Sequence, residues 1–128
     1  MSGGAASAVE FAADAGIKLD YSLASIKVVE QQLAGLHSQI PAKSPSAQEI
    51  RRMSLMFGAY MGEVLKRNYG GSWSKKSALH PGQDILTFHV RGKEVWPHIK
   101  AEKRIIDGPE DNVWFYFQTL LKELGPPP

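Results

Sequence analysis

The sequence predicts a single α+β domain, with N-terminal helices, a small antiparallel sheet and two C-terminal helices around one core. Apolar residues recur every three or four positions up to about residue 69 and again after residue 97, which is typical of amphipathic helices. Between these regions the pattern alternates over Ile85–Val90 and resumes after Arg91-Gly92, which indicates a hairpin. A chain of 128 residues has room for one such core.

The chain divides into three regions. Residues 1–16 are expected to be flexible or weakly helical, residues 17–125 to form the domain, and residues 126–128 to be a disordered tail. In the first region, Ser7 and Glu10 have the spacing of a capping box, so a short helix would begin at Ser7.

Two helices are expected before the sheet. The first would run from Leu23 to Ile40 and end at Pro41, because proline lacks the N–H that a helix needs. The second would begin at the capping box Ser46-Ala47-Gln48-Glu49 and extend to about Asn68. Apolar residues cover most of its circumference, which predicts a long, buried, central helix.

The sheet is expected within about residues 72–96. A short strand would surround Trp73, Ile85–Val90 would form the second, and Glu94–Trp96 would return as the third. Two C-terminal helices follow, over Ile99–Ile106 and Val113–Leu124. Proline and acidic residues precede the last helix, where both suit a helix N-terminus.

The composition excludes several kinds of site. The chain has no cysteine, which excludes disulfides, thiol nucleophiles and cysteine-ligated metals. No apolar run is long enough to span a membrane, and the first residues lack the basic start of a secretory signal. We therefore expect a cytoplasmic protein with no membrane partner. We also expect no cofactor and no metal, since the four histidines have no zinc-binding spacing.

No catalytic residue is predicted, because the chain has neither a nucleophile elbow nor a dinucleotide fingerprint. Glu63 lies among apolar residues of the long helix and is the best candidate for a tuned carboxylate. Arg67, four residues later, predicts an ordinary surface ion pair instead. An enzyme is therefore the least favoured hypothesis.

Two features of the helices suggest close contacts. Gly58 and Gly62 lie one turn apart, which predicts that another element crosses the long helix tightly there. The last helix cannot bury all of its aromatic residues on one face, so Phe115 or Tyr116 is expected at a contact surface.

Positive charge is concentrated in the middle of the chain. Residues 41–106 carry a net charge of +7, whereas residues 1–40 carry −2 and residues 107–128 carry −3. The densest mixture of basic and aromatic residues lies between positions 91 and 104: Arg91, Lys93, Trp96, His98, Lys100, Lys103 and Arg104. These residues are candidates for binding nucleic acid or another anion. In the other interpretation they form an ordinary solvated face, with lysine stems over Trp96.

Several short motifs resemble a family of small bacterial domains of unknown function. The resemblance covers about Leu19 to Leu124. Its most specific parts are Leu19-Asp20-Tyr21-Ser22, Gly58-Ala59-Tyr60-Met61-Gly62-Glu63-Val64, Gly70-Gly71-x-Trp73, Lys103-Arg104 and Gly108-Pro109-Glu110-Asp111-x-Val113. It implies a stand-alone cytoplasmic domain and suggests Glu63, Trp73, Lys103 and Arg104 as one cluster of binding residues. Some small domains of this kind are immunity or accessory proteins beside bacterial toxins, an analogy of context rather than of chemistry.

Two functional hypotheses follow. The first is a non-catalytic protein-interaction domain, which the mixed charge, the absence of a catalytic signature and the aromatic residues expected at a contact surface favour. The alternative is an anion-binding or nucleic-acid-binding module that uses residues 91–104. The sequence does not indicate an oligomeric state.

Overall fold

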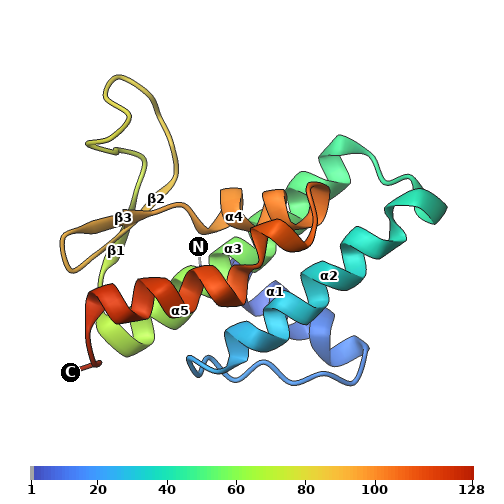
Figure 1. Ribbon diagram of the computed structural model, residues 1–128, viewed down its shortest axis with the longest axis horizontal. Helices are drawn as coiled ribbons and strands as arrows, with labels where there is room; N and C mark the ends of the chain where they lie inside the picture. Colours follow the sequence, from blue (N-terminus) through green and yellow to red (C-terminus); the bar gives the residue numbers. More distant parts are fainter. Residues whose placement is uncertain (1) are drawn as a thin grey trace.

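A computed structural model describes residues 2–128 of the protein (Figure 1). The architecture is α+β, as the sequence predicts. The elements in chain order are α1 (Ser2–Asp14), α2 (Ser25–Lys43), α3 (Ala47–Tyr69), β1 (Ser72–Ser74), β2 (Thr87–Val90), β3 (Lys93–Val95), α4 (Pro97–Ile106), a 3-10 helix η1 (Pro109–Asp111) and α5 (Val113–Leu124).

The α-helices form the body of the domain, and the small sheet projects from one end of it (Figure 1). The long α3 contacts α1 and α4, and α2 contacts α4 and α5. The loop between β1 and β2 extends beyond the sheet. Within residues 2–128, no helix has both the length and the apolar character needed to cross a bilayer.

The N-terminal region, expected to be flexible or weakly helical, is a regular helix. α1 begins at Ser2 and not at the capping box predicted at Ser7. A Cβ added to Gly4 would lie only 2.9 Å from the Cβ of Ala59 in α3, so small residues let the two helices approach closely. This packing extends the helix beyond its local capping signal and leaves three alanines fully buried: Ala5, Ala8 and Ala12.

The second helix continues past Pro41 to Lys43, so the prediction that Pro41 ends it is wrong. Pro41 lies in the last turn of α2. Its missing N–H removes one backbone hydrogen bond, and the helix tolerates this loss because no further turn follows. Ser44 ends the helix in a left-handed conformation, with φ of 44°, and its N–H donates to the Ile40 carbonyl at 2.9 Å.

The central helix begins at the predicted capping box. The Ser46 hydroxyl accepts a hydrogen bond from the Glu49 N–H at 3.1 Å, and the Glu49 carboxylate accepts one from the Ser46 N–H at 3.4 Å. The predicted close crossing at the two glycines is confirmed. A Cβ on Gly58 would lie 2.5 Å from the Cα of His98 in α4, and one on Gly62 would overlap the indole of Trp73 in β1.

The three strands form an antiparallel sheet in the order β1-β2-β3. The predicted hairpin turn is confirmed, since Arg91 and Gly92 both have positive φ (47° and 77°), as in a type I′ turn. β2 is shorter than expected, because it begins at Thr87 rather than at Ile85. β3 is shifted by one residue, since it runs from Lys93 to Val95 rather than from Glu94 to Trp96. Trp96 leaves the sheet because it forms the N-cap of α4.

Alanine substitution at Gly58 tests whether the α3–α4 contact is as close as described. The added Cβ would meet the backbone of α4, which cannot move aside as a side chain can. We expect Gly58→Ala to lower the free energy of unfolding by about 1–3 kcal/mol, the usual range for overpacking. The measurement is urea unfolding followed by tryptophan fluorescence.

The matched control is Gly35→Ala, in the middle of α2. A Cβ at Gly35 would meet nothing within 4 Å. Because alanine is the better helix former, Gly35→Ala should leave stability unchanged or raise it by up to about 1 kcal/mol. Equal effects of the two substitutions would contradict the close contact.

Candidate functional site

Two of the predicted binding residues attach the hairpin to α5. Arg91 Nη1 donates hydrogen bonds to the carbonyl oxygens of Leu124 at 2.7 Å and Pro126 at 2.9 Å. Lys93 Nζ lies 3.0 Å from Glu123 Oε2. Arg91 therefore satisfies carbonyl groups at the C-terminal end of α5, as cations commonly do at helix ends.

Trp96 and His98 also have internal contacts. Trp96 Nε1 donates to Thr87 Oγ1 at 3.0 Å, which joins the start of α4 to β2. His98 packs on Gly58 and is partly buried. Burial lowers the pKa of the His98 imidazole, and the negative charge of Glu102 opposes this shift. Both residues connect α4 to its neighbours.

Two lysines of α4 differ in exposure. Lys100 Nζ lies 4.5 Å from the centre of the Tyr116 ring, a cation–π contact between α4 and α5. Lys103 is exposed, as a surface binding residue would have to be. The residues between 91 and 104 thus combine internal contacts with exposed cations, of which Arg91 and Lys93 have partners on α5 or just after it.

Arg104 is not part of an exposed basic surface, which corrects its interpretation as a surface binding residue. Its Nε donates to both carboxylate oxygens of Glu30 in α2, at 3.0 and 2.9 Å, and the residue is only 5% exposed. Glu30 Oε1 also accepts the Val113 N–H at the start of α5. One buried carboxylate thus joins three helices. Its partners lie 74 and 83 residues away in the sequence, so no local pattern indicates it.

Glu63 forms the predicted ion pair with Arg67, at 3.1 Å. Trp73 packs over Gly62 and meets the Phe88 ring edge-on, with centroids 5.1 Å apart. Among the described residues, no hydrogen bond or ion pair joins Glu63 or Trp73 to the basic residues of α4. The structure therefore does not bring the four residues suggested by the resemblance together as one bonded cluster.

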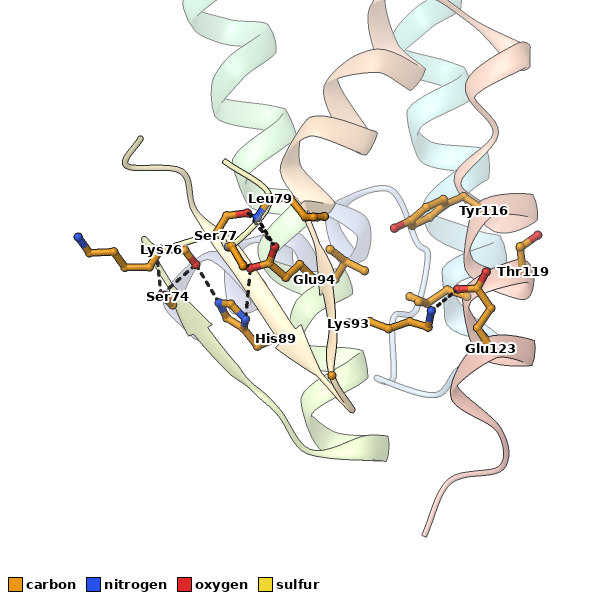
Figure 2. Close-up of a pocket in the computed structure, with 14 residues that line it drawn as sticks. Ser74, Lys76, Ser77, Leu79, His89, Lys93, Glu94, Tyr116, Thr119 and Glu123 are labelled. Atoms are coloured by element: carbon orange, nitrogen blue, oxygen red, sulfur yellow. Dashed lines mark hydrogen bonds and ion pairs between the residues drawn. The ribbon is translucent and has the colours of Figure 1, made fainter. Parts of the chain in front are cut away.

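A groove of about 850 Å³ opens beside the sheet, between β3 and α5 (Figure 2). We call this the β3–α5 groove. One wall is the β1–β2 loop with His89 and Glu94, and the other is α5 with Lys93. Its lining residues are Ser74, Lys76, Ser77, Ala78, Leu79, His89, Gly92, Lys93, Glu94, Val95, Tyr116, Thr119, Leu120 and Glu123.

The Glu94 carboxylate fixes the loop wall of the groove. It accepts hydrogen bonds from the Ser77 hydroxyl at 2.8 Å, the Ala78 N–H at 2.9 Å and the Leu79 N–H at 3.2 Å. Partial burial raises the pKa of Glu94, but these three hydrogen bonds and the nearby His89 outweigh it, so the net shift is downward. Leu79 is held in place yet remains 68% exposed.

The α5 wall combines an apolar floor with an exposed ion pair. Leu120 and Val95 are buried at its base, beside Tyr116. Burial, reinforced by the charge of Glu123, raises the pKa of the Tyr116 hydroxyl. Above this floor, the Lys93–Glu123 ion pair crosses between strand and helix (Figure 2), with side chains 41% and 52% exposed.

The free edge of β3 lies within this groove. Residues 92–95 all line it, although their side chains alternate between the two faces of the sheet. In a two-residue hairpin, the residues flanking the turn, here Val90 and Lys93, exchange both backbone hydrogen bonds. The next pair, His89 and Glu94, does not. The N–H and C=O of Glu94 therefore point away from β2, and no hydrogen-bond partner for them is found among the described residues.

Sequence reasoning identified part of this groove. Both the predicted binding residue Lys93 and Tyr116, one of the two aromatic residues expected at a contact surface, line it. Phe115, the other aromatic candidate, is 70% exposed and lies outside the groove. Glu94, Leu79 and Thr119 were missed, because only the fold brings the β1–β2 loop and α5 to the same strand. An acidic residue inside a three-residue strand was the one available signal.

The chain matches no protein-family model, no curated protein and no solved structure. The resemblance to a family of small bacterial domains therefore stays a prediction.

The buried ion pair should contribute far more to stability than the exposed one. Arg104→Met leaves the Glu30 carboxylate buried without its cation, so we expect a loss of about 3–5 kcal/mol of unfolding free energy. Lys93→Met is the control, because its ion pair with Glu123 is exposed and should contribute about 1 kcal/mol or less. Urea unfolding of both variants measures the difference, and similar losses would contradict it.

Glu94 should make stability fall in acid. Because its pKa is lower in the folded protein than in the unfolded chain, its ionised form stabilises the fold. This contribution is complete above the ordinary glutamate pKa and is lost as the pH falls through the folded-state value. Thermal unfolding at a series of acidic pH values should therefore show a smaller acid loss for Glu94→Gln than for wild type. Ser77→Ala, which removes one donor, should move the loss to higher pH; identical curves for all three proteins would contradict the role of Glu94.

Proposed function

We propose that this protein is a non-catalytic interaction domain that binds an extended segment of another protein as an added strand on β3. The observation that carries the proposal is the outward-facing N–H and C=O of Glu94 in the β3–α5 groove. Backbone hydrogen bonds to such an edge provide affinity for any extended chain, and the walls of a groove select among sequences.

The rigidity of the groove supports this function. Three hydrogen bonds to the Glu94 carboxylate hold the loop wall, and Arg91 holds the end of the α5 wall. A site that is already formed loses little conformational entropy when it binds. Most of the conformational entropy lost on binding would then be that of the bound segment, so the flexibility of this segment would set much of the affinity.

The character of β3 also fits a specific partner. Exposed edge strands promote aggregation, and proteins protect them by keeping them short and charged. β3 has three residues, and two of them, Lys93 and Glu94, are charged. Such an edge disfavours unspecific pairing, whereas a segment that complements these side chains can still bind.

The two other hypotheses receive less support. For an enzyme, the Glu94 carboxylate is the polar group best placed in the groove, but its oxygens already hold the loop. For anion binding by residues 91–104, Lys93 and Arg104 have carboxylate partners and Arg91 binds carbonyl groups, which leaves Lys103 as the most exposed cation of α4. The resemblance supports the finer part of the proposal, an accessory or immunity role in a bacterial cytoplasm.

The test is selection from a displayed library of random linear peptides, followed by synthesis of the most enriched peptide. We expect binding to slow hydrogen exchange at the Glu94 amide, which lies on the free edge, and to leave the already bonded Lys93 amide unchanged. N-methylation of the peptide at alternate residues should abolish binding at edge-facing amides and be tolerated at the others.

Matched variants place the binding in the groove. Thr119 lines the groove and Gln118 does not, although both are exposed on α5. Thr119→Arg should weaken binding by about tenfold or more, because the larger side chain fills the space that the peptide needs, whereas Gln118→Arg should have little effect. The proposal fails if no peptide is enriched, or if binding leaves the Glu94 amide exchange unchanged.

A further inference from the structure

We infer that the segment bound in the β3–α5 groove has the pattern apolar–any–acidic, read from its N-terminus, and that its acidic residue takes Lys93 from Glu123. This inference rests on the proposed function and adds the chemistry of the partner. It comes from the alternation of side chains along β3 and from the contacts of the two residues that face α5.

The alternation of side chains along β3 determines which positions of the partner segment face α5 and which face the loop wall. Lys93 and Val95 share one face of the sheet, toward α5, while Glu94 points to the other face and holds the loop. Both strand pairs of the sheet are antiparallel, and a segment that binds antiparallel to β3 continues this arrangement. It places one residue opposite each position of β3, with side chains on the same face and Cβ atoms about 4.5–5.5 Å apart.

The position opposite Val95 selects an apolar side chain. Val95 and Leu120 are 2% and 5% exposed, and together with Tyr116 they form the floor of this wall. On the side of α4, the Lys100 ammonium group lies over the Tyr116 ring. This cation borders the apolar floor and shields that side of it from water. An aliphatic side chain placed here would bury its own apolar surface and the part of the Tyr116 ring that is still exposed, because Val95 and Leu120 are already covered.

The position opposite Lys93 selects an acidic side chain. The bond between Lys93 Nζ and Glu123 Oε2 is 3.0 Å long, but both side chains are about half exposed, and such pairs contribute about 0–1 kcal/mol. A segment inserted between β3 and α5 must separate them. A carboxylate directly across the strand then restores the charge partner of Lys93, whereas a neutral side chain would leave it unpaired.

Because antiparallel strands run in opposite directions, the residue opposite Val95 precedes the residue opposite Lys93 by two positions. The resulting order in the partner is an apolar residue, any residue, then aspartate or glutamate. The middle residue is the one whose backbone bonds to Glu94, and its side chain faces the loop wall, where Leu79 is exposed.

The experiment compares the peptides selected by wild type with those selected by charge variants of the groove. We expect aspartate or glutamate two positions after an aliphatic residue in the wild-type selection. Lys93→Glu should replace the acid by lysine or arginine and weaken the wild-type peptide by about tenfold or more. Lys122→Glu makes the same charge change on α5 outside the groove lining, so it should keep the acidic preference.

Glu123→Gln gives a test of opposite sign. It removes the intramolecular competitor for Lys93, so it should strengthen binding of the wild-type peptide by up to about fivefold, the ratio that corresponds to an exposed ion pair. A purely structural role of Glu123 would weaken binding instead.

The outcomes separate this inference from the proposed function. If selected peptides protect the Glu94 amide but show no acidic preference, or if Lys93→Glu and Lys122→Glu behave alike, the partner pattern is wrong and strand addition still holds. If no peptide protects the Glu94 amide, both proposals fail.

Discussion

The close approach of three elements to α3 sets the positions of the rest of the structure. Gly58 lies under the backbone of α4, Gly62 lies under Trp73 of β1, and Ala59 meets Gly4 of α1. Side chains of ordinary size at these positions would push each element outward. Protein interiors are packed as densely as crystals of small organic molecules, so a displacement at α3 would shift the elements that pack on it. The Trp73 indole and the start of α4 are thus two of the places where the sheet is fixed to the helices.

A second constraint is the buried polar network that joins α2, α4 and the start of α5. The Glu30 carboxylate binds the Arg104 guanidinium and the Val113 N–H, which fixes α4 and α5 against α2. A buried pair of this kind is costly to break, although it need not add net stability compared with apolar residues. Its role here is to set the relative positions of helices, and hence the place of α5 beside β3.

The β3–α5 groove follows from these two constraints acting together. α3 carries the sheet and α2 positions α5. The sheet and α5 meet at a buried base that includes Val95 and Leu120, and above it through the exposed Lys93–Glu123 ion pair. A gap lined by a strand edge and a helix remains, and the Glu94 carboxylate holds the β1–β2 loop as one wall of it. The same residue thus presents its backbone to the groove and holds one wall of the groove with its side chain.

The sequence by itself determined the fold class, the capping box at Ser46, the hairpin turn and the close crossing at Gly58 and Gly62. Each depends on neighbours in the chain or on the absence of a side chain, and local patterns report both. Tertiary packing decided what local signals could not. It extended α1 beyond Ser7, let α2 pass Pro41, buried Arg104 against Glu30 and left Glu94 at a free edge. Those outcomes depend on residues far apart in the chain, whose meeting no periodicity or spacing encodes.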